Sequence, residues 1–282
     1  MRTVIVAATM LASWVSVVAC VPSPVGRSSA CADEPQEATV TASATTSGAT
    51  RAEGEPLVIA VEGTPHSMTL LPIDVNGTKL WVATHETVWE LYDTLVFKLD
   101  QKSGTSGSAA ADAVTRPTKP YVAADRGFGH NGFPAVSVSF GGAKSFCEWL
   151  SAKTGRTVRL PTQAEREAIA AAIDVPDESL GDLAWFQSNA GTATRKAGQL
   201  QADRLGLYDV LGNVGEWAVA SDGSGVIMGG SFEEPAADLE PADARPATDD
   251  WNASDPQFPK SIWWLTDAPF AGFRVVIERT PG

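Results

Sequence analysis

The stretch GLYDVLGNVGEW, Gly206–Trp217, places three glycines, one asparagine and two carboxylates among apolar and aromatic residues. Glycine lets the backbone fold back on itself, and the acidic side chains supply oxygen donors. Two structures fit this combination: a turn that holds a metal ion, or a tight turn in which Asp209 and Asn213 bond their own backbone. The stretch by itself favours the plain turn, so the choice depends on the rest of the sequence.

Composition limits the classes of function. The chain has 282 residues, of which 44% are hydrophobic, enough for the packed core of one large domain or two modest ones. Its formal net charge is -13 and its isoelectric point is near 4.6. Such a surface repels phosphate backbones, and we expect no nucleic-acid partner.

The N-terminus predicts export. MRTVIVAATMLASWVSVVAC, residues 1–20, carries one Arg and an apolar run that is too short to span a bilayer comfortably and is typical of a signal peptide. Val17–Cys20 resembles a bacterial lipobox, in which Cys20 becomes the lipidated first residue. We therefore expect a cell-envelope protein held at the membrane by a lipid anchor. Cleavage after Ala30–Ala32, which would give a secreted or periplasmic soluble product, and an uncleaved signal anchor are the alternatives.

The next segment has the composition of a tether. Residues 21–56 include TASATTSGATRAEGEP and contain almost no large apolar side chain. Such a stretch buries too little surface to offset the entropy of ordering it. We predict a disordered tether over 21–56 and one domain over 57–282, with Ser103–Pro120 as a loop inside that domain.

The first part of the domain has the pattern of strands. LVIAVEG from Leu57, MTLLPIDV and TKLWVAT are runs of apolar and alternating residues. Asn76 and Gly77 separate the last two runs, and both tolerate positive φ. The sequence therefore predicts a β-hairpin around Asn76–Gly77.

Helix signals follow the hairpin. Thr87–Glu90 fits a capping box, and the apolar residues after it form one buried helix face, made by Val88, Leu91, Tyr92 and Leu95. FPAVSVSF, residues 133–140, is expected to be a strand or extended segment, and the helix GGAKSFCEWLSAKTG should end at Gly155. A second capping box at Thr162–Glu165 predicts a helix to about Ile173, and residues beyond 174 are expected to be rich in loops.

These motifs occur in a familiar order. The run from FPAVSVSF to PTQAE, then GLYDVLGNVGEW, GGSF and GFRVV, resembles the formylglycine-generating-enzyme or sulfatase-modifying-factor domain. ATHETVWELYDTLVF is similar to that family's early E-V-T helix. The resemblance covers Leu57 to the C-terminus. It implies one α+β domain of low regular secondary structure, with a fold related to C-type lectins.

The resemblance also implies a reaction that these residues do not support. Family oxidases convert a sulfatase cysteine to formylglycine with molecular oxygen and a copper(I) ion, held by two cysteines C-terminal to the GGS motif. After Gly229–Phe232 this chain has no cysteine, because its three are Cys20, Cys31 and Cys147. Cys147 shares an apolar helix face and is expected in the core, unpaired with Cys31. We therefore expect no copper oxidase site.

A calcium site is implied by the same resemblance. The family's structural Ca²⁺ would be held by the side chains of Asp209 and Glu216 and by the carbonyls of Gly212 and Val214, all oxygen donors as a hard cation requires. With the resemblance, calcium becomes the favoured interpretation of the GLYDVLGNVGEW turn. A second family site near Asn189 cannot be traced in this sequence.

Three positions depart from the family pattern. Gly215 and Arg166 stand where the family has Trp, and Gln163 stands where it has Glu. Losing a buried Trp typically costs about 3 to 5 kcal/mol unless neighbours refill the space. We expect that the refilling side chains come from Trp251, Trp263 or Trp264.

The sequence leaves three candidate functions open. The first is an exported, lipid-anchored domain without copper oxidase activity that acts as a binding or structural module for an unidentified protein or glycan. The second is an oxidoreductase of sulfatase maturation that works through an unrecognised site. The third is a carbohydrate-binding module that stacks sugars on the aromatic residues of WNASDPQFPKSIWWLTD, residues 251–267.

Overall fold

The Asn76–Gly77 turn joins the two longest strands, β3 (Ser67–Val75) and β4 (Thr78–Ala83). Both turn residues have positive φ, 52° for Asn76 and 83° for Gly77. The Asp74 carboxylate accepts the backbone N–H of Gly77 at 2.7 Å, which closes the turn. The predicted hairpin is therefore confirmed.

The computed structural model describes residues 48–101, 109–120, 123–173, 175 and 179–279. The predicted signal peptide, the lipobox at Cys20 and most of the predicted tether lie outside the described residues. No helix within these ranges is both long and apolar enough to cross a membrane.

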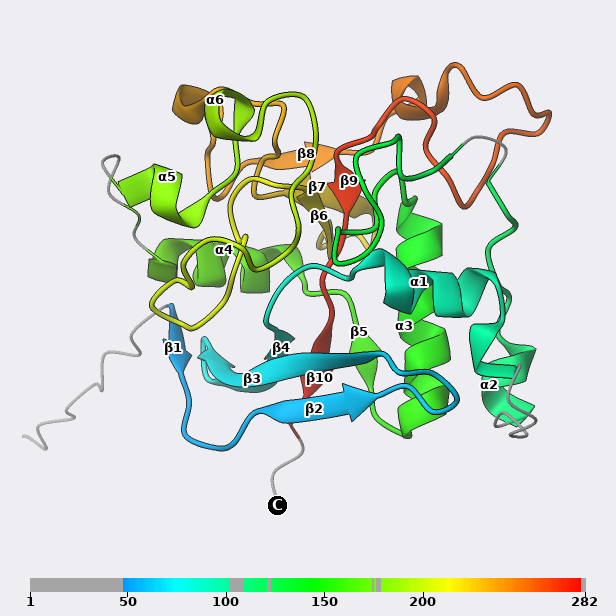
Figure 1. Ribbon diagram of the computed structural model, residues 1–282. Coiled ribbons are helices and arrows are strands. Elements are labelled where there is room, and N and C mark those ends of the chain that lie inside the picture. Colours follow the sequence, from blue (N-terminus) through cyan, green and yellow to red (C-terminus); the bar gives the residue numbers. More distant parts are fainter. Residues whose placement is uncertain (1–47, 102–108, 121–122, 174, 176–178, 280–282) are drawn as a thin grey trace, which may run out of the picture. The chain divides into compact units, whose positions relative to one another are not determined.

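The main sheet gathers strands from both ends of the domain (Figure 1). Its order is β1-β3-β4-β10-β5, and β2 pairs with β3 beside β1. β10, from the GFRVV segment, lies between β4 and β5 and is antiparallel to both. The remaining strands of this sheet are β1 (Ala49–Arg51), β2 (Leu57–Ala60), β5 (Val158–Arg159) and β10 (Val276–Glu278).

β1 lies within the stretch expected to be a tether. Ala49 is buried and pairs with Val75, while Thr50 and Arg51 are exposed. The ordered domain therefore begins before Leu57. A three-residue strand among Ala, Thr and Gly gives no periodic signal; pairing with β3 and burial of Ala49 in the core hold it in place.

A second sheet begins directly after the GLYDVLGNV turn. Its order is β8-β7-β6-β9, with β6 and β9 parallel and the other pairs antiparallel. The large side chains that are fully buried between and around the sheets include Tyr92, Phe146, Trp149, Trp217 and Phe273. The strands are β6 (Gly215–Val219), β7 (Gly225–Met228), β8 (Ala244–Pro246) and β9 (Ala271–Gly272).

Helices cover part of these sheets and long irregular segments connect them, so the fold is α+β with low regular content, as predicted (Figure 1). The longest helices are α3 and α4. The α-helices are α1 (Trp89–Val96), α2 (Ala109–Ala113), α3 (Phe140–Thr154), α4 (Gln163–Ile173), α5 (Leu180–Leu183) and α6 (Gln187–Ala190). Short 3₁₀ helices are η1 (Leu99–Gln101), η3 (Ala236–Asp238) and η4 (Asp249–Asn252).

The helix boundaries test the predicted caps. Gly155 ends α3 with φ of 66°, as predicted. Ahead of α4, the Thr162 hydroxyl accepts the Glu165 N–H at 3.2 Å and the Glu165 carboxylate accepts the Thr162 N–H at 2.8 Å, which confirms that capping box.

The capping box predicted at Thr87–Glu90 is wrong. Val88 is the N-cap residue of α1 and makes no side-chain cap bond, and the Thr87 hydroxyl has no hydrogen-bond partner among the residues that the structure describes. Glu90 instead accepts the N–H of Gly132 at 2.7 Å. The Glu90 carboxylate, which the local pattern predicts to cap the helix, therefore makes a long-range hydrogen bond instead.

FPAVSVSF forms an extended segment, one of the two expected alternatives, rather than a strand. Ser137 has φ of 58°, which interrupts the extended run, and in the described part of the chain the segment makes isolated bridges, Val88 to Pro134 and Val138 to Trp264. Ala135, Val136 and Val138 are buried. The apolar pattern of the segment thus reports burial in the core rather than pairing in a sheet.

Candidate functional site

The GLYDVLGNVGEW turn is held by two neighbouring segments, the one that contains Trp185 and the GGSF segment. Gly212 N–H donates to the Gly229 carbonyl at 2.8 Å, and Asn213 N–H donates to the Trp185 carbonyl at 2.8 Å. The Phe232 N–H donates to the Asn213 carbonyl at 3.0 Å. The turn therefore docks against the GGSF segment and stands directly ahead of β6.

Positive φ angles fold this turn. Asp209, Gly212 and Asn213 have φ of 50°, 72° and 51°. A Cβ atom at Gly212 would lie 2.2 Å from the Trp185 carbonyl oxygen, so the glycine is required there both for its φ and for the close approach. The bends turn Asp209 and Asn213 toward the interior, where both are buried.

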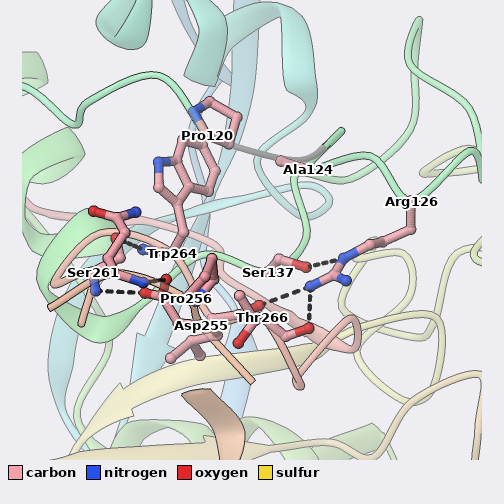
Figure 2. A pocket seen from close by; sticks show the side chains of 11 residues that line it. Pro120, Ala124, Arg126, Ser137, Asp255, Pro256, Ser261, Trp264 and Thr266 are labelled. Carbon is pink, nitrogen blue, oxygen red and sulfur yellow. Dashed lines mark hydrogen bonds between the residues drawn. The ribbon is translucent and has the colours of Figure 1, made fainter. Parts of the chain in front are cut away.

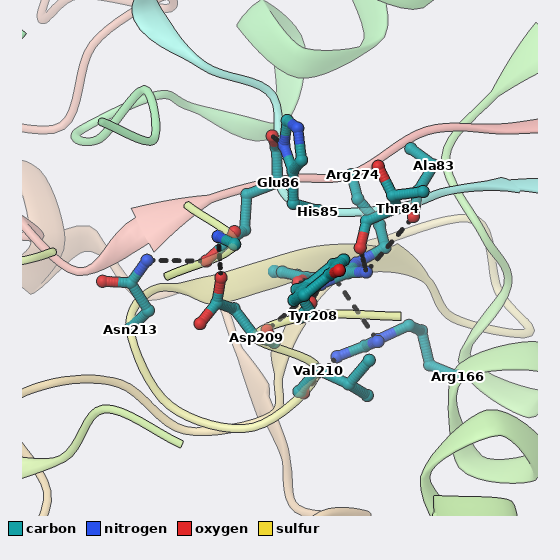
Figure 3. A network of polar contacts seen from close by, with 12 residues as sticks. Ala83, Thr84, His85, Glu86, Arg166, Tyr208, Asp209, Val210, Asn213 and Arg274 are labelled. Carbon is teal, nitrogen blue, oxygen red and sulfur yellow. Dashed lines mark hydrogen bonds and ion pairs between the residues drawn. The ribbon is translucent and has the colours of Figure 1, made fainter. Parts of the chain in front are cut away.

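Five charged residues meet behind the turn, and we call them the buried charge cluster (Figure 3). They come from the segment before α1, from α4, from the turn, from β6 and from the segment before β10. All are at most 2% exposed. The members are Glu86, Arg166, Asp209, Glu216 and Arg274.

Glu216 and Arg274 form the centre of the cluster. Arg274 Nε lies 2.9 and 2.7 Å from the two Glu216 oxygens, and its Nη2 lies 2.6 Å from Oε1. The remaining N–H groups of Arg274 donate to the carbonyls of Ala83, Thr84, Tyr208 and Asp209. Burial opposes the charge of Arg274, but the adjacent Glu216 outweighs it and raises the Arg274 pKa.

Arg166 is the second cation of the cluster. Its Nη1 lies 3.4 Å from Glu216 Oε2, and its Nη2 donates to the Val210 carbonyl at 3.1 Å. Burial lowers the pKa of Arg166, and the charge of Glu216 opposes that shift. Arg166, which stands where the family has Trp, thus places a positive charge in the core. Its ion pair in the described part of the chain is with Glu216.

The two other carboxylates of the cluster are less well satisfied. Glu86 Oε1 accepts a hydrogen bond from the Asn213 side chain at 2.9 Å, and Asp209 Oδ2 accepts one from Gly198 N–H at 2.6 Å. Glu86 Oε2 and Asp209 Oδ1 are buried and have no hydrogen-bond partner among the described residues. Burial raises the pKa of Glu86 well above its ordinary value and that of Asp209 to about 6.

The calcium ligands implied by the family were Asp209, Gly212, Val214 and Glu216. All four are buried in or beside the turn. Asp209 has a bare oxygen and fits a cation ligand, but both oxygens of Glu216 accept N–H groups of Arg274. The set as implied therefore does not fit a calcium ion. Calcium binding itself stays a prediction.

The space left by the second family Trp is filled differently from our expectation. A Cβ atom at Gly215 would lie 2.4 Å from Ile227 Cγ2 and 3.5 Å from Arg245 Nη2, so Ile227 and Arg245 occupy that side. Trp251 packs on the neighbouring Trp217, with ring centroids 5.8 Å apart. Ile227 and Arg245 thus fill most of the space beside Gly215, and Trp251 adds only a contact with the neighbouring Trp217.

A copper site does not fit the segment after GGSF. The Glu234 carboxylate accepts both the N–H and the hydroxyl of Ser231 at 2.5 Å, and it pairs with Arg245 at 2.7 Å. Cys147 is buried on α3, and burial raises the pKa of its thiol. The sequence after the motif contains no cysteine, so it supplies none of the thiolates that copper(I) needs.

The histidines do not form a metal centre. His85 contacts the backbone of Glu86 at 2.8 Å, and His130 pairs with Asp93 at 2.8 Å while stacking on Trp89. Within the described ranges, no group of three or more His, Cys, Asp or Glu side chains is placed to hold a metal ion.

One pocket lies beside the C-terminal loop (Figure 2). Arg126 forms one side, donating to Ser137 Oγ at 3.0 Å and to the carbonyls of Leu265 and Thr266 at 2.9 and 2.6 Å. Trp264 lines the pocket, and its indole N–H donates to the Thr118 carbonyl at 2.7 Å. The volume, about 40 Å³, suits a few water molecules and is far below that of an ordinary ligand site.

Sequence reasoning missed Glu86 and Arg274 as members of the site. Both stand in segments that carried the resemblance, HETV and GFRVV. The available signal was a charged residue inside an apolar strand or at a helix start, where the neighbouring side chains are buried. Their partners are far away in sequence, 127 residues from Glu86 to Asn213 and 58 from Arg274 to Glu216.

Comparison with known proteins identifies the family and the fold. The family model for the sulfatase-modifying factor enzyme 1-like domain matches residues 108–279. Variable protein 1 of Treponema denticola is 18% identical, with a TM-score of 0.50, over 82% of this chain and 94% of that one. PvdO from Pseudomonas aeruginosa is 22% identical, with a TM-score of 0.54, over 80% of this chain and all of that one.

At these identities the two structures show a shared fold alone. Comparison with curated proteins gave no match. The family model, in contrast, spans the segments that build the buried charge cluster from α4 onward, and it covers more than half of the sequence. The chain belongs to the sulfatase-modifying factor enzyme 1-like domain family.

Proposed function

We propose that this family member is an exported, lipid-anchored protein whose domain works as a binding or structural module without copper oxidase chemistry. The observation that carries the proposal is the sequence after the GGSF motif, which contains no cysteine. Glu234 in this segment accepts a backbone N–H and a hydroxyl of Ser231 and pairs with Arg245. Copper(I) is held by thiolates, and these groups supply none.

An oxygen-consumption assay tests the absence of oxidase activity. With copper(I) and a CxPxR peptide, we expect no oxygen uptake above the rate of copper alone and no formylglycine in the peptide by mass spectrometry. The reason is that no cysteine follows GGSF in the sequence, and Cys147, which lies before it, is buried in α3. A copper-loaded active oxidase of the family serves as the positive control.

Turnover in this assay would support the alternative, an oxidoreductase of sulfatase maturation with an unrecognised site. Robust formylglycine formation by the unaltered protein would overturn the proposal.

Export and anchoring rest on the sequence of residues 1–20 alone. In a bacterial host, the unaltered protein is expected in the membrane fraction and Cys20→Ala in the soluble or secreted fraction, because one thioether-linked lipid group would be missing. Cys31→Ala is the matched control, and it should fractionate like the unaltered protein. Cys20→Ala that still pellets with membranes would contradict lipidation at this residue.

The carbohydrate-binding alternative receives little support from the aromatic residues of 251–267. Trp264 is buried and its indole N–H is satisfied, and Trp251 packs on Trp217 and Phe270. The large apolar side chains that this segment does expose are Phe258 and Ile262, at 101% and 68%. An aliphatic side chain beside one phenyl ring fits a protein surface better than a sugar.

A further inference from the structure

The loop of residues 255–262 turns its apolar side chains toward solvent. Four large hydrophobic side chains in the described part of the chain are exposed, and this loop carries two of them, Phe258 at 101% and Ile262 at 68%. Figure 1 shows the loop, in orange, extending outward from the domain. The fold gains no burial energy from a phenyl ring that stays in water, so folding does not explain this placement.

Hydrogen bonds hold the loop in one conformation. The Asp255 carboxylate is buried and accepts the N–H groups of Gln257 and Ser261 at 2.9 and 2.6 Å. Lys260 Nζ donates to the Asn252 carbonyl at 2.8 Å, and Asn252 Nδ2 donates to the Ser261 carbonyl at 3.0 Å. These polar groups are engaged inside the loop, while its apolar groups remain outside. A loop that is already ordered loses little conformational entropy when it binds a partner.

The loop is also fixed to the longest helix. Ser139 is the N-cap residue of α3, and its hydroxyl donates to the Ile262 carbonyl at 2.6 Å. The Ser139 N–H donates to the Trp263 carbonyl at 3.0 Å. The exposed side chain of Ile262 therefore stands on a rigid support, as do the anchor residues of stable protein interfaces.

The charge beside the loop is negative. Residues 249–267 contain four aspartates and one lysine, which gives a net charge of -3. Asp249 and Asp250 begin η4, and the last residue of η4, Asn252, bonds the loop through Lys260. Both aspartates are exposed and make no ion pair with any residue that the structure describes. The apolar tip thus has free carboxylates next to it, and the ammonium of Lys260 is bound to the backbone.

This charge distinguishes between possible occupants. A second copy of the chain would bring a loop of the same charge, on a molecule whose net charge is -13. An anionic lipid surface would be repelled in the same way. A positively charged protein surface is attracted, and complementary charge of this kind fixes the choice of partner at an interface.

We propose that the 255–262 loop is a docking element, and that its partner is a protein surface with an apolar pocket bordered by Lys or Arg side chains. Phe258 fills the pocket and Ile262 packs at its edge, while Asp249 and Asp250 pair with the basic border. This inference rests on the proposed function as a binding module and names the class of partner that the module takes.

An amphipathic helical peptide of leucine and lysine is the probe, and the same peptide with glutamate for lysine is the charge control. Fluorescence anisotropy measures their binding to the full-length chain carrying Cys20→Ala, which lacks the predicted lipidation site and needs no detergent. The lysine peptide should bind and the glutamate peptide should not. Replacing Phe258 and Ile262 together with serine should weaken binding of the lysine peptide about tenfold or more.

Val58→Ser is the matched control, because Val58 is 60% exposed but lies on β2, outside the loop. It should bind the lysine peptide as tightly as the unaltered chain. Asp249→Asn combined with Asp250→Asn should weaken binding about threefold at low salt and flatten its salt dependence. All these side chains are exposed, so urea unfolding should be unchanged and should exclude a folding defect.

Four outcomes would overturn the inference. Two concern the probe: equal binding by the serine variant of Phe258 and Ile262, or equal binding of the glutamate peptide. The others identify a different occupant: binding to phosphatidylglycerol vesicles that depends on Phe258 indicates a membrane, and self-association that depends on Phe258, measured by sedimentation, indicates a second copy. None of them involves oxygen uptake or formylglycine, so failure of this inference is distinguishable from failure of the proposed function.

Discussion

Replacing Arg274 with methionine is expected to lower the free energy of unfolding by about 3 to 5 kcal/mol, since removing one member of a buried ion pair leaves the other charge unpaired. Arg274 makes three contacts of 2.6 to 2.9 Å with Glu216 and donates to four backbone carbonyls, and both side chains are buried. Arg166, at 3.4 Å, is too distant to replace these bonds. Urea unfolding followed by tryptophan fluorescence measures the loss.

Arg156→Met is the control for this substitution. Arg156 is exposed and its side chain forms no bond in the described part of the chain, so the change should stay within about 0.5 kcal/mol. The double variant Arg274→Met with Glu216→Met should recover part of the loss, because an apolar pair leaves no bare charge. A loss below about 1 kcal/mol in the single variant would show that Glu216 is neutralised by another group.

Gly212→Ala is expected to destabilise the fold by roughly 3 kcal/mol or more, a large effect for one methyl group. Two costs add at this position. The φ of 72° disfavours any L side chain, and the new Cβ would lie 2.2 Å from the Trp185 carbonyl oxygen, which is backbone and cannot rotate away. Because Asn213 N–H donates to that same carbonyl, relief of the clash would also break the turn.

Gly155→Ala separates the two costs. Gly155 has a similar φ of 66° at the end of α3, but a Cβ there would meet nothing within 4 Å. Its loss of stability should be about 1 kcal/mol, from the left-handed conformation alone. Equal losses in the two variants, measured by the same urea titration, would contradict a backbone clash at Gly212.

Local sequence signals predicted the parts of the fold that local forces decide. Asn76–Gly77 requires positive φ at both residues, Gly155 ends α3, and the Thr162–Glu165 box is closed within four residues. The Thr87 box failed because a long-range contact decides it: the carboxylate of Glu90 accepts the N–H of Gly132 instead of bonding at its own helix start. The pattern of FPAVSVSF left a strand and an extended segment open, because both share one pattern when they are buried, and the structure has the second.

Asp209 and Glu216 were expected as calcium ligands implied by the family resemblance, and calcium binding stays a prediction. The structure buries both side chains. Which carboxylate is neutralised by an arginine depends on Arg274, 58 residues beyond Glu216, and on Arg166 in α4. Spacing along the chain carries no information about such contacts, since they form only when the two sheets and α4 come together.

The placement of β10 has a consequence for the order of events during synthesis. Its residue Val276 pairs with Val82 of β4, so the centre of the main sheet joins segments separated by almost 200 residues. Until that last strand arrives, β4 and β5 have no neighbour on their facing edges. Folding is therefore expected to be late and slow rather than progressive along the nascent chain.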